Sequence, residues 1–196
     1  MYNMQIFAIL FFLSANLVFT QSPDSILITK QNEFNSFIIE KKHSPYSQVR
    51  KFQKMVDKEI PIEITGLNKQ KQNYMELYYI IFDSSKTPLY FTTSEYINSN
   101  QCYLSHSYYF DSIGRTIFYS FYLGFYDSLS NKIVRKYHNF YFSTNFEILS
   151  QGEWFQDNSS QIIQDNSNYQ LPYCFDVKYL GCNNFLSVIR KFKIKL

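Results

Sequence analysis

The chain contains three histidines, the side chains best suited to proton transfer near neutral pH, and they are far apart in the sequence. His43 falls in a polar linker, whereas His106 and His138 fall in β-like segments that a sheet would have to bring together. The Gly-x-Ser-x-Gly turn of serine hydrolases is absent, and the five glycines form no phosphate-binding loop. Glu147 and Glu153 are only nominal candidates for a carboxylate pair. The sequence therefore favours a non-catalytic protein without a cofactor.

The cysteines Cys102, Cys174 and Cys182 are odd in number, which predicts one disulfide and one remaining thiol. No second close pair of Cys or His completes a tetrahedral zinc site, so no metal is expected. Residues 174–182 alternate as in one strand, which would separate the two ends by roughly 26 Å. Bridged Cα atoms lie only about 4.4–6.8 Å apart. We therefore expect Cys102 to pair with one of the other two cysteines, although a sharp bend at Gly181 would also allow Cys174 to pair with Cys182.

Two aromatic features are candidates for binding a partner. Trp154, the single tryptophan, lies where an aromatic-rich region gives way to a polar segment, and its ring is suited to stack on a sugar or a protein side chain. A position in the core is the favoured alternative, because large aromatic side chains are usually mostly buried. The second feature is one face of the strand around residues 116–126, which carries Phe118, Tyr122 and Tyr126. Other aromatic residues join it if the neighbouring strands pair as expected: Tyr103, Tyr109, Phe140. This face is exposed unless another segment covers it.

Alternation along the chain predicts the strands that position these residues. Within Thr116–Tyr126, Ile117 and every second residue after it are apolar or aromatic, and the intervening positions mix aromatic and small residues. Segment Cys102–Phe110 alternates in the same way. Asp111–Gly114 and Asp127–Asn131 have the residue types of tight turns. Residues 102–149 therefore predict three consecutive antiparallel strands.

The N-terminal residues divide into a leader and an extension. Met1–Ser22 contains no charged side chain and has an apolar run over residues 6–19, as in a cleaved secretory signal peptide. Because no basic residue precedes the run, an uncleaved anchor through residues 6–19 is the alternative. Residues 23–58 form an extension in which Ser25–Lys30 and Phe34–Glu40 suggest edge strands. An amphipathic helix is expected at residues 47–58.

Residues 59–196 are expected to form one antiparallel β domain. Strands are predicted at Tyr74–Phe82, Tyr173–Tyr179 and Leu186–Ile194, and the lysine alternation over residues 190–196 suits an edge strand. Residues 151–170 read as a long polar loop carrying an N-glycosylation sequon at Asn158. No internal repeat is convincing. The expected fold is all-β, an antiparallel β-sandwich or alternatively an up-and-down β-barrel, with one short N-terminal helix.

Composition narrows the partners further. A net charge of +3 without a clustered basic face gives no reason to expect nucleic acid. The leader and the sequon point to an extracellular protein that binds a glycan or a protein partner through its aromatic face. Two other functions fit the pattern: a small carrier of lipid or another hydrophobic ligand inside a barrel, and a signal-anchored subunit of a membrane complex. A membrane is a partner only if the leader stays uncleaved.

Overall fold

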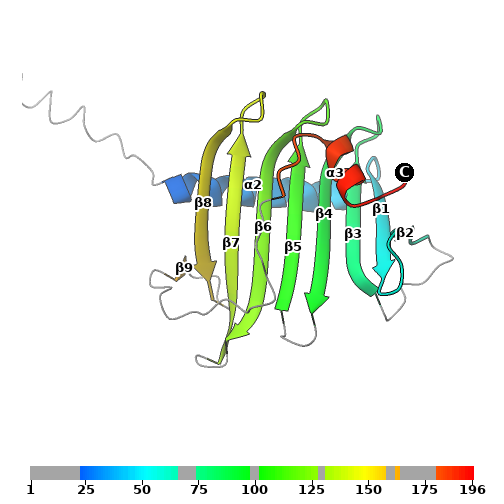
Figure 1. The fold of residues 1–196 in the computed structure, drawn as a ribbon. Coiled ribbons are helices and arrows are strands. Elements are labelled where there is room, and N and C mark those ends of the chain that lie inside the picture. Colours follow the sequence, from blue (N-terminus) through cyan, green and yellow to red (C-terminus); the bar gives the residue numbers. More distant parts are fainter. Residues whose placement is uncertain (1–22, 66–73, 98–101, 128–130, 158–161, 164–179) are drawn as a thin grey trace, which may run out of the picture.

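A computed structural model describes residues 23–65, 74–97, 102–127, 131–157, 162–163 and 180–196. Its strands form one open antiparallel sheet of nine strands in the order β2-β1-β3-β4-β5-β6-β7-β8-β9, with helix α2 on one face and α3 on the other (Figure 1). The predicted antiparallel all-β fold with an N-terminal helix is thereby confirmed, and the strands lie in a single sheet. The elements are α2 (Pro23–His43), β1 (Gln48–Met55), β2 (Ile62–Glu63), β3 (Tyr74–Phe82), β4 (Pro88–Ile97), β5 (Cys102–Phe110), β6 (Thr116–Asp127), β7 (Lys132–Phe142), β8 (Ile148–Gln156), β9 (Ile162–Ile163) and α3 (Phe185–Lys191).

The N-terminal helix is not where the sequence placed it. The two expected edge strands are parts of α2, which buries Leu27, Phe34 and Ile38 along one side at helical spacing. Its last turn is basic, which favours the carboxyl end of a helix. The expected helix at residues 47–58 is instead β1, which pairs with β3 over its whole length. Pairing with a distant strand overrides local helical preference there.

The C-terminal prediction is also wrong, because the expected strand Leu186–Ile194 is mostly helix α3. Asn184 caps this helix, and its side-chain oxygen accepts a hydrogen bond from the Ser187 backbone N–H. Thr116 donates from its backbone N–H to Asn183 and from its hydroxyl to the carbonyl of Cys182, which ties the segment to the start of β6. The predicted strand Tyr173–Tyr179 lies outside the described residues.

Three hairpin loops at one end of the sheet share the same geometry. In the loop at Asp111, the side chain accepts hydrogen bonds from the backbone N–H groups two and four residues later. The fourth residue, Gly114, has a positive φ of 79°. This confirms the predicted Asp111–Gly114 turn. The loops at Asp83 and Ser143 repeat both features, with positive φ at Lys86 and Phe146.

The two faces of the sheet follow the predicted alternation. Every second residue of β6 from Tyr119 to Phe125 lies in the larger core on the α3 face, together with phenylalanines from the neighbouring strands. Phe118, Tyr122 and Tyr126 have the opposite parity and face α2. Ile117 departs from this pattern and packs on the α2 side, because the pairing of β5 with β6 shifts by one residue beside it.

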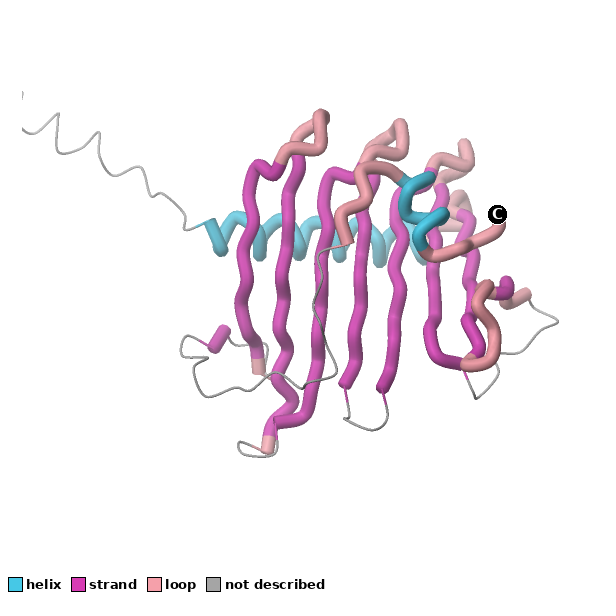
Figure 2. The backbone as a smooth tube through the Cα atoms, viewed as in Figure 1, coloured by secondary structure: helices cyan, strands magenta, loops and turns pink. Residues whose placement is uncertain are grey.

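Helix α2 runs across the strands rather than along them (Figure 2). A helix of 21 residues is about 32 Å long, close to the roughly 29 Å that separate β8 from β1 across seven strands. A helix is only about 10 Å wide, whereas the 12 residues of β6 extend about 40 Å. One transverse helix therefore covers a strip of this face and leaves the rest of each strand uncovered.

Candidate binding site

The strip beneath α2 is apolar and buried. It contains Phe118, Tyr109, Ile81 and Trp154, which pack with Leu27 and Ile38 of the helix. Tyr109 donates its hydroxyl to the side chain of Asn35 on α2 at 2.8 Å. Part of the aromatic face therefore belongs to a second core, as one of the two predicted alternatives had it.

Four tyrosines lie at the edge of the strip or beyond it, and we call them the tyrosine face: Tyr103, Tyr122, Tyr126 and Tyr137. The rings of Tyr103 and Tyr122 are 5.6 Å apart, and those of Tyr122 and Tyr137 are 5.1 Å apart. Tyr137 then stacks on Trp154 at 5.6 Å. This continuous row of rings crosses β5, β6, β7 and β8. Tyr103 and Tyr126 remain 37% and 42% exposed, so part of the row is open to a ligand.

One groove of about 350 Å³ lies within the tyrosine face and is lined by Tyr103, Tyr122, Gly124, Phe125, Tyr126, Ile133 and Arg135. Gly124 determines its shape, because a Cβ at this position would lie 2.8 Å from the Tyr122 hydroxyl oxygen. Tyr122 therefore leans along β6 over Gly124. Its hydroxyl forms a hydrogen bond with Arg135, which lies directly opposite Gly124 on β7.

A second groove of about 410 Å³ adjoins the first and shares Tyr103 with it. It lies between the carboxyl-terminal half of α2, with Ile38 and Lys42, and the surface of β1, β3, β4 and β5. Its lining includes hydroxyl groups that bond to one another: Thr92 to Ser105 at 3.1 Å and Tyr103 to Ser94 at 2.8 Å. The two grooves together present aromatic rings and hydroxyls side by side.

Two hydroxyls of the tyrosine face, those of Tyr122 and Tyr137, have a raised pKa and keep their protons at neutral pH. Burial raises the pKa of Tyr137 to about 12. Burial also raises the pKa of Tyr122, although the positive charge of Arg135 and its hydrogen bond act in the opposite direction. Both hydroxyls can therefore donate as well as accept hydrogen bonds.

The predicted site residues fall into two groups. Tyr122 and Tyr126 line the first groove, whereas Phe118 and Trp154 are buried, with Trp154 only 5% exposed inside β8. The expected polar loop begins later than predicted, because residues 151–156 belong to β8. Phe140 does not join the tyrosine face, because it lies in the core of the α3 face. Asn158 lies outside the described residues.

The sequence prediction missed Gly124, Arg135 and Tyr137. A usable signal was present in the turn predicted at Asp127–Asn131. Counting back from the observed pairing of Asp127 with Lys132 places Gly124 opposite Arg135 and Tyr122 opposite Tyr137.

The histidines and cysteines do not form a site together. His106 and His138 lie on strands either side of β6, each opposite Phe121, so one strand separates them. Cys102 is the first residue of β5. Cys182 lies beside Thr116, which pairs with Phe110 at the other end of β5, so the two cysteines are roughly 26 Å apart. Pairing of these two cysteines is therefore wrong, and the thiol of Cys182 is free and buried. Any pairing through Cys174 lies outside the described residues.

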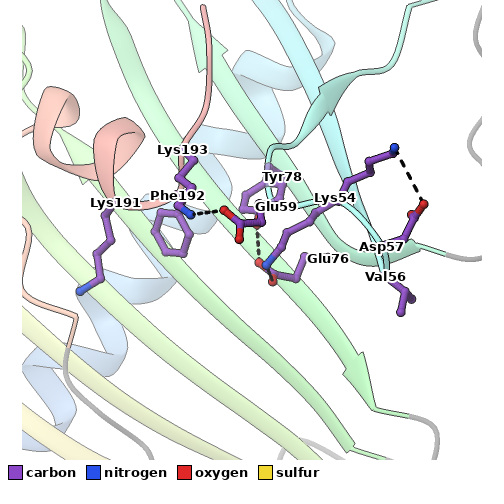
Figure 3. Close-up of a pocket in the computed structure, with 10 residues that line it drawn as sticks. Lys54, Val56, Asp57, Glu59, Glu76, Tyr78, Lys191, Phe192 and Lys193 are labelled. Atoms are coloured by element: carbon purple, nitrogen blue, oxygen red, sulfur yellow. Dashed lines mark hydrogen bonds and ion pairs between the residues drawn. The ribbon is translucent and has the colours of Figure 1, made fainter.

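The opposite face has a cavity of about 590 Å³ near the ends of β1 and β3. Its carboxylates are each paired with a lysine: Glu76 with Lys54 at 2.8 Å, Glu59 with Lys193 at 3.0 Å and Asp57 with Lys58 at 3.9 Å. Lys191 lies apart from these pairs (Figure 3). The cavity joins the C-terminal segment to the loop after β1, and a charged ligand there would compete with existing ion pairs.

Comparison of the chain with protein-family models, with curated proteins and with solved structures gives no match. Neither described helix combines the length and the apolar character needed to cross a bilayer. Within the described ranges, His, Cys, Asp and Glu side chains form no cluster able to hold a metal ion.

Proposed function

We propose that the protein is a secreted, non-catalytic module that binds a glycan through the tyrosine face. The observation that carries this proposal is the pair of adjoining grooves, in which partly exposed tyrosine rings lie beside hydroxyl groups. Sugars offer C–H groups that pack on aromatic rings and hydroxyls that exchange hydrogen bonds, so the lining matches both of their surfaces. The uncharged leader Met1–Ser22 and the sequon at Asn158 support an extracellular location.

A protein partner is the competing ligand for the same surface, because tyrosine is also favoured at protein interfaces. The groove beside α2 favours the glycan, since most of its polar lining groups are hydroxyls that can exchange hydrogen bonds with a sugar. The carrier alternative has less support, because the strand order runs from β2 to β9 without closing into a barrel.

The test is binding of the full chain to a panel of immobilised hexasaccharides, followed by calorimetry on the best ligand. Tyr126→Ala removes a ring at the groove edge and is expected to weaken binding by up to about tenfold, the equivalent of about 0.5–1.5 kcal/mol. Tyr46→Ala is the matched control, because Tyr46 is 77% exposed and lies outside both grooves. Its affinity should equal that of the unaltered protein.

Absence of binding to any hexasaccharide would contradict the proposal. Equal weakening by Tyr126→Ala and Tyr46→Ala would also contradict it, because the tyrosine face would then have no special role. If the chain instead binds a purified extracellular protein, and only Tyr126→Ala weakens that binding, the ligand of the tyrosine face is a protein and not a glycan.

A further inference from the structure

The charged side chains that line the two grooves are all positive. Lys42 lines the groove beside α2 and Arg135 lines the groove over Gly124, and neither lining includes an aspartate or a glutamate. Among the described residues, no carboxylate lies within ion-pair distance of either cation; Lys42 is exposed, whereas Arg135 is half-buried. A half-buried charge without a counter-charge loses hydration without compensation.

Arg135 differs in this respect from the other arginines that pack against the sheet. Arg50 forms two hydrogen bonds of 2.7 Å with the carboxylate of Glu63. Arg115 donates to Asp111 at 2.7 Å. Arg135 is instead held by neutral oxygens, the Tyr122 hydroxyl and the backbone carbonyl of Asp157 at 2.9 Å. These contacts orient the guanidinium, but among the described residues they supply no negative charge.

The local sequence positions this arginine in the groove. The missing side chain at Gly124 lets the Tyr122 ring lie along β6, so that its hydroxyl reaches Arg135. Tyr103 and Tyr126 line the same groove. A guanidinium oriented in this way, next to aromatic rings, is suited to bind the planar fork of a carboxylate or the oxygens of a sulfate.

We infer that the glycan ligand is acidic and that Arg135 binds its carboxylate or sulfate group, an inference that rests on the proposed function. The tyrosine rings then contact the sugar ring that carries the acid. The lysine cavity on the opposite face is a poorer site for the same ligand, because its carboxylates are already paired with lysines and would repel an anion.

The experiment compares sugars that differ only in charge. Full-length protein is titrated with a hexagalacturonate and with its methyl ester, and then with a sulfated hexasaccharide and its desulfated form. We expect the acid to bind at least about tenfold more tightly than the ester, or the sulfated form than the desulfated form. Whichever pair shows the difference identifies the acidic group.

Three variants assign the effect to Arg135. Arg135→Gln should abolish the difference between acid and ester. Arg135→Lys keeps the charge without the fork and should retain part of the difference. Lys132→Gln is the matched control, because it removes the same charge from an exposed position on β7 whose side chain points to the opposite face. It should preserve the full difference.

The outcomes separate the two proposals. If the protein binds acid and ester with equal affinity, and Tyr126→Ala weakens binding of both, the inference of an acidic ligand is wrong and the proposed glycan binding stands. An equal effect of Arg135→Gln and Lys132→Gln would overturn the role of Arg135, because general charge attraction would then explain the preference. Lack of binding to all four sugars would overturn the glycan function itself. If Arg135→Gln does not fold, Arg135→Lys decides, since an unchanged preference for the acid would contradict recognition by the fork.

Discussion

The two faces of the sheet are built by the same strands and differ in almost every other respect. On the α3 face, β6 contributes Tyr119, Phe121, Leu123 and Phe125, which are all nearly inaccessible. On the α2 face, the same strand contributes the buried Phe118, two small residues and two tyrosines, of which Tyr122 is half-buried and Tyr126 is 42% exposed. The α3 face buries most of the apolar surface that stabilises the fold. The α2 face combines a narrow buried strip with an accessible polar and aromatic surface. This division predicts that the two faces respond differently to substitution.

The largest contrast should come from removing one ring on each face. Phe91 is fully buried on the α3 face and contacts Tyr78, Tyr108 and Phe192. Phe91→Ala should lower the free energy of unfolding by about 3–5 kcal/mol. Tyr103→Ala on the open face should lower it by less than about 1 kcal/mol. Urea unfolding of both variants measures the difference, and similar losses would mean that the tyrosine face is as much a core as the other face.

A second contrast between the faces is the loss of folding stability at low pH, which we expect from a histidine on the α3 face. Burial, assisted by the charge of Lys191, lowers the pKa of His106 on the α3 face to about 4, and the ring bonds to the Tyr119 hydroxyl at 2.7 Å. The unfolded chain binds this proton near pH 6.5 and the folded protein does not, so stability is complete above pH 6.5 and falls as the pH drops toward 4. The loss should approach about 3 kcal/mol at pH 4.

The check on His106 is the slope of unfolding free energy against pH between 6.5 and 4. His106→Asn should flatten this slope whatever it does to stability at neutral pH. His43→Asn, a change at the exposed end of α2, should leave the slope as it is in the unaltered protein. A slope that survives His106→Asn would assign the acid sensitivity to other groups.

The sequence predicts most of the sheet because the information for it is local. Alternation fixes which residues of β5 and β6 share a face, and Asp111–Gly114 fixes the turn between them. The α2 helix was missed because its buried residues, Leu27, Phe34 and Ile38, are separated by polar residues and read as two short apolar runs. The spacing of Val49 and Phe52 in β1 suits either a helix or a strand, and only the distant strand β3 decides between them.

The candidate site was only half predictable for a related reason. Tyr122 and Tyr126 belong to a parity that the sequence displays, so their common face could be inferred. Their exposure depends on where α2 crosses, and that position follows from the length of the helix and the width of the sheet. The burial of Trp154 has the same cause, because the amino-terminal half of α2 packs closely on β8.

The buried part of the α2 face offers a third test. Asn139 is fully buried on β7 between Ser120 and Gly152, and neither its side-chain oxygen nor its nitrogen has a hydrogen-bond partner among the described residues. A buried amide without partners costs about 1–3 kcal/mol. Asn139→Ala removes the amide without adding volume and should therefore stabilise the protein by an amount at the lower end of this range, because the small cavity that it leaves offsets part of the gain. A clear loss of stability in thermal and urea unfolding would show that the amide is hydrogen-bonded in solution, for example to a buried water molecule.

The smallest effect should come from a charged corner of the α3 face. Glu76 and Glu95 lie directly opposite each other on β3 and β4, and Glu76 also bonds to Lys54 and to the Tyr78 hydroxyl. Burial raises the pKa of Glu95, and the charge of Glu76 adds to this effect. A raised carboxylate pKa means that the folded state binds a proton more readily than the unfolded chain, so this residue favours folding at low pH and opposes it once ionised.

Glu95→Gln should therefore stabilise the protein at pH 7 and should have no such effect below about pH 4, where the unfolded chain is also protonated. Like charges on directly opposite residues cost about 0.2–1 kcal/mol, and the lower end applies because Glu95 is partly exposed. Glu147→Gln, at an exposed hairpin loop, is the control and should change stability equally little at both pH values. A stabilisation by Glu95→Gln that persists unchanged at low pH would point to a packing effect. A loss at pH 7 would mean that Lys54 compensates both carboxylates, and the α3 face would then have no electrostatic cost at this corner.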